Sequence, residues 1–326
     1  MSHEVLKVNS ELLHKMKDHY SGTSTAHPPQ HALFAAKTGG CTITAYRSGK
    51  VLFQGGGAET EASRWKAAGA TGAGAKTAKN KTSGTGRSAV DSHEYAPPAE
   101  NLPSRLLLGS DEAGTGDFFG PITVACAYLT KEQMKAVEPM GIRDSKTIKD
   151  PEIRELAPEI VKHSTYSLLT LSNEKYNSLQ EKGWNQGRMK AMMHHQAIMN
   201  VLKKCDAQGL EPEGAFIDQF CQPGVYFNYL RQSNHKWERN MPLYFATKGE
   251  SLHVGIAAAS VIARFSFIRE MDRLEADLGM PVPKGAGPKV DQAAAAIIRK
   301  KGKETLRKYT KMHFANTAKA ERLVKR

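Results

Sequence analysis

Cysteine is scarce in this sequence, and its spacing carries no motif. Only four cysteines occur, at positions 41, 126, 205 and 221, and none of them belongs to a CxxC pair. Clustered cysteines would be needed for a zinc site or a disulfide framework, so neither organises the chain. Long apolar runs are also missing, because no uninterrupted stretch approaches the roughly 20 residues of a membrane-spanning helix. The first residues lack a signal-peptide pattern, so we expect a cytoplasmic protein without membrane contact.

An acidic excess is absent, and the basic excess is spread unevenly. The 326 residues carry a net charge of +13. Residues 284–326 hold 13 basic and 3 acidic side chains, whereas residues 105–283 hold 21 and 22. A concentrated basic segment is typical of proteins that neutralise phosphates. A solvated tail that serves solubility is the alternative, and it stays open on charge alone.

Large apolar residues are missing from the segment that starts at residue 69. Its first part reads GATGAGAKTAKNKTSGTGRSA. Such a segment buries too little surface to offset the entropy of ordering it. We interpret residues 69–104 as a flexible linker between residues 1–68 and residues 105–326.

Residues 1–68 predict a compact α+β module. Its expected helices cover residues 10–17 and 59–68, and its strands cover residues 31–36, 41–47 and 51–54. Ser10 is the expected N-cap of the first helix, and Trp65 is the apolar anchor of the second. Lys37, Arg47 and Lys50 lie near the turns of the sheet, where they would hold a nucleic-acid backbone. A small α+β domain without this role is the alternative.

The rest of the chain is organised around residues 106–129, LLLGSDEAGTGDFFGPITVACAYL. Apolar runs at Leu106–Leu108 and Ile122–Leu129 predict two strands around a Gly-rich acidic centre. Asp111 and Glu112 are expected at the end of the first strand. Two neighbouring carboxylates repel each other beside a buried strand, and a divalent cation with oxygen ligands would offset that cost. An exposed hairpin turn is the alternative, and spacing alone does not decide between the two.

Two further acids stand at the ends of predicted elements. Asp218 closes a short apolar strand over residues 215–218, and Glu250 opens a long helix, Leu252–Met271, rich in small residues. Carboxylates at strand ends can converge on one edge of a sheet. Each acid also has a structural explanation. Asp218 could cap the next segment of the chain, and Glu250 could be stabilised by the helix dipole at the N-terminus of the helix.

The remaining elements expected in this region are helices over residues 131–137 and 186–204, a helix that begins at Asp150, and a strand over residues 163–171. His194 and His195 lie on the Met-rich apolar side of the longer helix, and we interpret them as structural. Two short helices over residues 291–298 and 303–312 have basic ends. They predict a surface for a duplex backbone that is formed by Lys300, Lys301, Lys303, Arg307, Lys308 and Lys311.

Residues 111–121, DEAGTGDFFGP, resemble the first signature of the type 2 ribonucleases H. The continuation GTGD is closer to ribonuclease HIII than to ribonuclease HII. The resemblance extends over residues 105–326. A weaker one makes the first 66 residues similar to the N-terminal substrate-binding domain of the family, which is like half of the TATA-binding protein.

The resemblance implies an α/β, ribonuclease H-like mixed sheet flanked by helices, preceded by the small α+β domain. It implies that Asp111, Glu112, Asp218 and Glu250 are the catalytic and metal-binding residues, and that they hold two Mg²⁺ or Mn²⁺ ions. The implied activity is endonucleolytic hydrolysis of the RNA strand of RNA–DNA hybrids, which leaves 5′-phosphate and 3′-hydroxyl ends. No obligate protein partner is evident, and we expect a monomer.

The resemblance also indicates substrate-binding residues. The main chain of Gly114, Thr115 and Gly116 is suited to sensing 2′-hydroxyls. Ser145 and Lys146 match an Asp-Ser-Lys motif that could contact phosphate, although capping explains the serine equally well. Two other functions are alternatives. A non-catalytic protein that binds RNA or hybrids would use the same basic surface, whereas a nucleotide site of the P-loop type is disfavoured because its G-x-x-x-x-G-K-[ST] pattern is missing.

Overall fold

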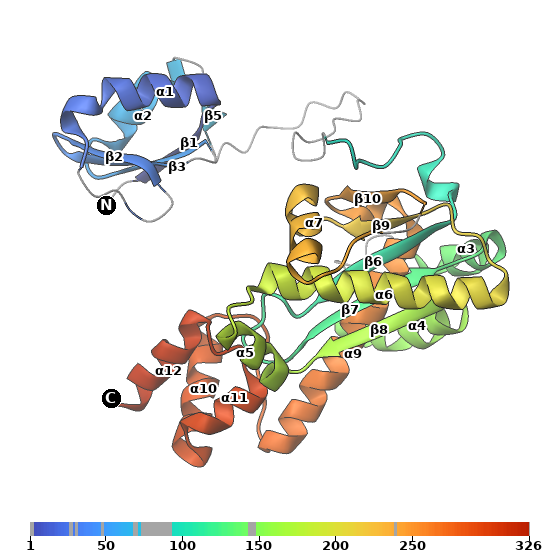
Figure 1. Cartoon of the computed structure of the whole chain (residues 1–326). Coiled ribbons are helices and arrows are strands. Elements are labelled where there is room, and N and C mark those ends of the chain that lie inside the picture. The colour runs from blue at the N-terminus through green and yellow to red at the C-terminus, as the bar shows by residue number, and fades with distance from the viewer. Residues whose placement is uncertain are drawn as a thin grey trace. The chain divides into compact units, whose positions relative to one another are not determined.

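The computed structural model describes residues 3–25, 29, 32–46, 49–67, 71–72, 93–142, 148–237 and 240–325. The chain separates into two compact units, residues 1–85 and residues 86–326 (Figure 1). Within the described residues, no helix is long and apolar enough to cross a membrane.

The first unit is an antiparallel sheet with two helices. Its strands are β1 (His3–Lys7), β2 (Ala32–Thr38), β3 (Cys41–Tyr46), β4 (Lys50–Gln54) and β5 (Thr71–Gly72), in the order β2-β3-β4-β1-β5. The helices are α1 (Ser10–His19) and α2 (Ala58–Ala67), with a 3₁₀ turn at Ser21–Thr23. The sequence predicted this α+β class, but it missed β1, which pairs with both β4 and β5.

Trp65 anchors α2 in the core of the first unit, as expected. This side chain is 7% exposed, and its Nε1 donates a hydrogen bond to Tyr20 Oη at 2.6 Å. Tyr20 in turn donates to Glu61 at 2.7 Å, which joins α1 to α2. The predicted cap of α1 was wrong by one residue, because Asn9 accepts the hydrogen bond from Leu12 N and Ser10 is the first helical residue.

The second unit is a five-stranded mixed sheet with helices on both faces (Figure 1). Its strands are β6 (Leu107–Ala113), β7 (Ile122–Tyr128), β8 (Thr165–Leu171), β9 (Gly214–Asp218) and β10 (Leu243–Ala246), in the order β10-β9-β6-β7-β8. The pairs β6–β7 and β7–β8 are antiparallel, whereas β6–β9 and β9–β10 are parallel. The predicted mixed α/β fold is therefore confirmed.

The helices of this unit follow the strands along the chain. They are α3 (Lys131–Val137), α4 (Asp150–Lys162), α5 (Asn173–Glu181), α6 (Gln186–Gln208), α7 (Pro223–Gln232), α8 (Gly249–Leu252), α9 (Val254–Leu278), α10 (Pro288–Lys301), α11 (Leu306–Tyr309) and α12 (Ala315–Val324). Short 3₁₀ turns lie at Leu102–Ser104, Glu138–Met140 and Lys303–Thr305.

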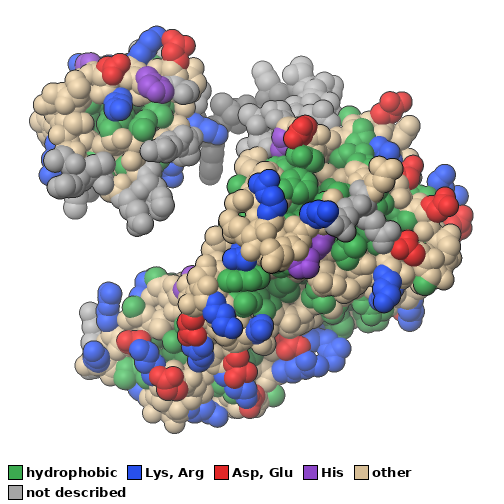
Figure 2. All heavy atoms as spheres, viewed as in Figure 1, with side chains coloured by type: hydrophobic (Ala, Val, Ile, Leu, Met, Phe, Trp, Pro, Cys, Tyr) green, Lys and Arg blue, Asp and Glu red, His purple; other side chains and the backbone are tan. Residues whose placement is uncertain are grey.

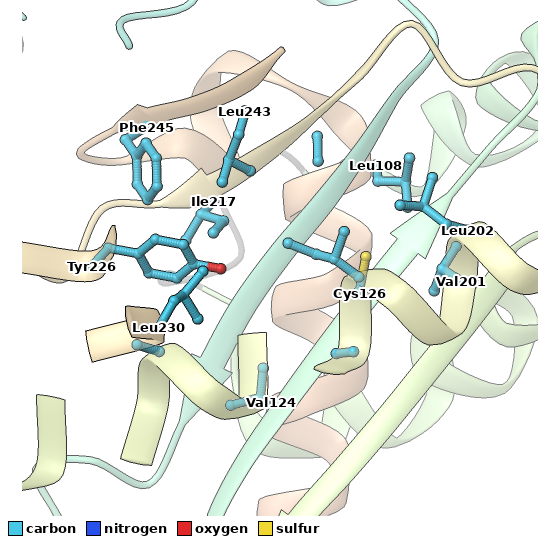
Figure 3. Packing of buried hydrophobic residues seen from close by; sticks show 14 of the residues in the cluster. Leu108, Val124, Cys126, Val201, Leu202, Ile217, Tyr226, Leu230, Leu243 and Phe245 are labelled. Atoms are coloured by element: carbon cyan, nitrogen blue, oxygen red, sulfur yellow. The ribbon is translucent and has the colours of Figure 1, made fainter. Parts of the chain in front are cut away.

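The alternation of side chains along β6 and β7 builds a core on each face of the sheet. On one face, strand residues meet α6 and α7, and on the other, small residues of β7 meet α4 and α9. Figure 3 shows the first of these cores, with the labelled residues Leu108, Val124, Cys126, Val201, Leu202, Ile217, Tyr226, Leu230, Leu243 and Phe245.

The second face is packed unusually closely. A Cβ atom added to Gly109 of β6 would lie 2.0 Å from the carbonyl carbon of Gly255 in α9. Real Cβ atoms do not approach backbone this closely, so only glycine allows the contact. The small residues of α9 therefore bring its backbone against the strand that carries the first two acids.

Two expectations about this unit were wrong in detail, and the structure adds a finding about the segment before it. The strand predicted at Leu106–Leu108 continues to Ala113, so the first two acids lie inside β6. The long helix is broken at His253, whose ring accepts a hydrogen bond from Gly255 N and also bonds the carbonyl of Arg105 at 2.9 Å. Of the segment interpreted as a linker, residues 93–104 pack on this unit, where Leu102 is 7% exposed.

Candidate active site

The acids of β6 leave the strand on opposite faces of the sheet. Ser110 and Glu112 face α6, where both contact His194. Asp111 faces α9, where it is hydrogen-bonded to Ser260. This division follows from the two-residue period of a strand. The hairpin-turn interpretation is thereby excluded, because both carboxylates belong to a strand in the middle of the sheet.

Asp111 and Asp218 stand side by side on neighbouring parallel strands. The register pairs Ser110 with Ile217, so the next residues along β6 and β9 are these two acids. Asp111 is 5% exposed. Burial, followed by the charges of Asp218 and Glu112, raises the pKa of Asp111 well above its ordinary value. A carboxyl group in this position is stabilised as an anion only when a cation comes close.

The fourth acid reaches the same edge through α8. Asp218 Oδ1 accepts a hydrogen bond from Gly249 N at 2.8 Å, and Glu250 is the next residue. Glu250 is 5% exposed. It lies in a helix of only four residues, so the expectation that it stands at the start of a long helix was wrong. The start of α8 is thus hydrogen-bonded to the end of β9, next to Asp111 of β6.

Glu112 is held by two side chains of α6, Lys190 and His194. Lys190 Nζ lies 2.7 Å from Oε1, and His194 Nε2 donates to Oε2 at 2.8 Å. Burial alone would raise the pKa of Glu112, but His194 and Lys190 outweigh it and lower the pKa to about 2. The ring of Phe220 stacks on His194 at 5.1 Å and lies under the Lys190 ammonium at 4.3 Å.

Sequence reasoning missed both of these partners. His194 was interpreted as structural, and Lys190 was not singled out at all. The available signal was their spacing of four residues, which places both on one side of a helix. A lysine on the buried side of a long helix indicates an acid opposite it, because an unpaired buried charge is strongly disfavoured.

The Gly-rich loop after β6 has a strained start and an open middle. Gly114 has φ +85°, and a Cβ there would lie 2.3 Å from the carbonyl oxygen of Pro121. Thr115 O accepts a hydrogen bond from Gln186 Nε2 at 3.1 Å. Gly116 is exposed, and a side chain there would meet nothing within 4 Å. The main chain near Gly116 is therefore accessible to a ligand.

The basic residues near the C-terminus are grouped with helices α10 to α12. Lys300 and Lys301 are exposed at the end of α10. Lys308 is exposed too, and its Nζ lies 2.7 Å from Asp277. Arg307 pairs with Glu181 and Lys303 with Glu321. On the face shown in Figure 2, basic side chains over these helices are accordingly interspersed with acidic ones.

Two of the predicted binding residues cannot be located, and one predicted surface residue is misplaced. Ser145 and Lys146 lie outside the described residues, as does Arg47 of the first unit. Lys311, expected on the duplex-binding surface, is fully buried, so that prediction was wrong. Its ammonium group contacts the carbonyls of the Gly-rich loop.

The donor set of the acid cluster fits a hard divalent cation. Carboxylate oxygens are the ligands that Mg²⁺ and Mn²⁺ prefer. The raised pKa of Asp111 indicates negative charge that is not balanced by protein groups. In the described part of the chain, however, no three His, Cys, Asp or Glu side chains already stand in a metal-binding arrangement. Glu112 contributes to this result, because Lys190 and His194 bind its oxygens on the α6 side.

Comparison with known proteins assigns the second unit to a family. The family model described as Ribonuclease HII matches residues 108–317, which include all four acids. A second model, described as a domain of unknown function (DUF3378), matches residues 3–79. Because the first match spans more than half of the sequence, the chain belongs to the ribonuclease HII family.

Relatives that match the chain over nearly its full length show which kind of ribonuclease in this family it is similar to. Ribonuclease HIII of Bacillus velezensis is 52% identical over 326 residues, which cover 100% of this chain and 99% of the relative. Ribonuclease HIII of Bacillus subtilis is 52% identical over 99% of this chain and 98% of its own length. The crystal structure of Bst-RNase HIII in complex with Mn²⁺ matches with a TM-score of 0.67 and 40% identity over 99% of both chains.

Within the family, these relatives place the chain among the ribonucleases HIII. The resemblance seen in residues 111–121 is therefore confirmed, and with it the class of enzyme, an endoribonuclease of the ribonuclease H type.

Proposed function

We propose that this chain hydrolyses the RNA strand of RNA–DNA hybrids with the help of divalent cations, and that Asp111, Glu112, Asp218 and Glu250 hold these cations. The observation that carries the proposal is the placement of Asp111 and Asp218 on adjacent parallel strands, and Glu250 follows Gly249, whose N–H donates to Asp218. Two Mg²⁺ or Mn²⁺ ions are proposed, and the Mn²⁺ complex of Bst-RNase HIII supports this choice of metal.

The cations supply the part of the chemistry that the side chains cannot. When bound, such ions activate water for attack on phosphorus and stabilise the departing 3′ oxygen. The side chains of the protein bind the cations and fix the direction of the carboxylates. Asp111 and Asp218 offer oxygens at one edge of the sheet, and Lys190 and His194 keep Glu112 ionised and fixed in direction. The products would carry 5′-phosphate and 3′-hydroxyl ends.

Recognition of RNA is proposed to involve the main chain of Gly114, Thr115 and Gly116. Its support is the accessible main chain at Gly116, where no side chain intervenes. Lys300, Lys301 and Lys308, together with Ser145 and Lys146, are proposed to contact phosphates. Residues 1–68 are proposed to be a separate substrate-binding domain and residues 105–326 the catalytic domain. Residues 69–104 are proposed to be a linker whose last part, residues 93–104, packs on the catalytic domain.

The enzyme is further proposed to act as a cytoplasmic monomer without an obligate protein partner. The four free cysteines support a reducing compartment. Size-exclusion chromatography with light scattering measures the oligomeric state directly, and a stable dimer would contradict this part of the proposal.

The deciding experiment compares cleavage of a labelled hybrid, double-stranded RNA and a duplex with one ribonucleotide, in Mg²⁺, Mn²⁺ or EDTA. Only the hybrid is expected to be cleaved well, and only with metal. Asp218→Asn should lower the rate by at least about 100-fold, because even outer-shell changes at metal sites cost about 10- to 100-fold. The matched control is Glu211→Gln, an exposed acid that should leave the rate unchanged. Tight hybrid binding without cleavage in any metal would instead favour a non-catalytic binding protein.

A further inference from the structure

Lys311, the buried lysine of the C-terminal segment, donates hydrogen bonds to main-chain carbonyls of the Gly-rich loop. Lys311 is 0% exposed, and its Nζ donates to the carbonyl oxygens of Asp117 at 2.8 Å and Gly120 at 2.6 Å. Pro121 O lies at 3.5 Å. All three carbonyls belong to the Gly-rich loop. A buried ammonium group is strongly disfavoured unless hydrogen bonds satisfy it, so this contact specifies where the loop main chain must lie.

Backbone hydrogen bonds tie the same two segments together. Lys311 N donates to Phe118 O at 2.9 Å, and Gly120 N donates to Tyr309 O at 3.0 Å. Asn173 of α5 adds a second donor to Gly120 O, at 2.8 Å. The loop and residues 309–311 therefore form one hydrogen-bonded cluster around Lys311.

This cluster packs against the residues that are proposed to bind the substrate. A Cβ atom on Gly114 would lie only 2.3 Å from the carbonyl oxygen of Pro121, so no side chain fits between the two residues. The start of the loop is therefore packed directly against its end. The position of Pro121 therefore limits where the main chain at Gly114 can lie.

We propose that Lys311 is a positioning residue for the substrate, which holds the Gly-rich loop in the conformation that meets the ribose of an RNA strand. The inference rests on the proposed function, in which the loop main chain senses 2′-hydroxyls. It assigns Lys311 an action through the loop, with no contact to the acids or to the scissile phosphate.

The test removes the ammonium group and keeps the side chain. Lys311→Met retains an unbranched apolar stem but leaves the carbonyls of Asp117 and Gly120 without this donor. The matched control is Lys319→Met, which also removes one positive charge from the C-terminal helices. Lys319 is 54% exposed and lies 4.0 Å from Asp291 at the edge of an ion pair.

Binding of a hybrid and of an all-DNA duplex of the same sequence is measured by fluorescence anisotropy in EDTA, so that no cleavage occurs. The preference for the hybrid should fall about tenfold in Lys311→Met, since displacement of positioning groups by about 1 Å can cost up to 100-fold. It should stay within about twofold of wild type in the control. Mn²⁺ affinity, followed by electron paramagnetic resonance, should be unchanged because the acids are untouched. An unchanged hybrid preference in folded Lys311→Met would overturn the proposal.

A second variant keeps the test decisive if Lys311→Met does not fold. Asn173→Ala removes the other donor to Gly120 O from a different element and should lower the hybrid preference in the same direction. If circular dichroism shows Lys311→Met unfolded and Asn173→Ala retains full preference, the proposal is overturned. A wild-type protein that prefers hybrids but cleaves none contradicts only the proposed catalytic function. One that binds both duplexes equally contradicts the positioning role.

Discussion

The contact between Lys190 and Glu112 allows a quantitative prediction for the metal-free protein. The two charged atoms are 2.7 Å apart, and both side chains are only 11% exposed. Lys190→Met would leave the Glu112 carboxylate buried with His194 as its remaining partner. Removing one member of a buried ion pair typically costs about 3–5 kcal/mol. His194 and Lys190 together lower the pKa of Glu112 from 4.5 to about 2, which corresponds to roughly 3 kcal/mol for both partners combined, at about 1.4 kcal/mol per pKa unit. We therefore expect a loss of about 3 kcal/mol in the free energy of unfolding at pH 7.

The contribution of Glu112 to the free energy of unfolding depends on pH with a definite sign. Because the folded-state pKa of Glu112 is depressed, its contribution is fully present above about pH 4.5 and is lost as the pH falls toward 2. Urea unfolding in EDTA, followed by circular dichroism, measures the loss at pH 7. The double variant Lys190→Met/Glu112→Gln should recover more than half of it, because no charge is then left unpaired. The control Lys162→Met, which breaks an exposed pair with Glu159, should leave the unfolding curve unchanged. A loss below about 1 kcal/mol, or a double variant that loses the sum of the single losses, would refute the reasoning.

Two further predictions concern packing and titration. Gly109→Ala should lower the free energy of unfolding by at least about 2 kcal/mol, because its methyl group would collide with the backbone of α9. Gly224→Ala, which meets nothing within 4 Å, is the control, and equal thermal stabilities would contradict the packing argument. Burial lowers the pKa of Lys311 from 10.5 to about 7, and Asp117 opposes this shift, while His313 is the other titratable group nearby. The folded state then binds fewer protons than the unfolded state above pH 7, so wild-type stability should rise between about pH 7 and 10. Lys311→Met should lack this rise in urea titrations, and identical curves for both proteins would count against it.

Local patterns were sufficient to predict the strands that carry Asp111, Glu112 and Asp218. The apolar runs on both sides of DEAGTGDFFGP become β6 and β7, and the run before Asp218 becomes β9. Spacing alone left the chemistry of Asp111 and Glu112 open between a cation site and an exposed turn, and the family resemblance favoured the cation site. The family resemblance supplied the fourth acid, Glu250, which no local pattern distinguishes from a helix cap.

Features that depend on long-range contacts could not be predicted. The partners of Glu112 depend on how α6 is rotated against β6, and a Met-rich helix offers no local sign of that rotation. Lys311 lies in a basic segment, so composition placed it at the surface, whereas its burial arises from three carbonyls nearly 200 residues earlier in the sequence. The break at His253 depends on the carbonyl of Arg105, which is equally remote.

The strand order of the second unit also determines when catalytic capacity arises during synthesis. A ribosome that has released β6 and β7 has delivered Asp111 and Glu112, but the strand that flanks β6 on its other side ends at Asp218. Glu250 emerges later still. A chain that terminates before Asp218 therefore lacks two of the four acids proposed to bind metal, and it lacks one neighbour of the strand that bears the others. Premature termination should yield inert fragments, and no partly competent nuclease should be released into the cell.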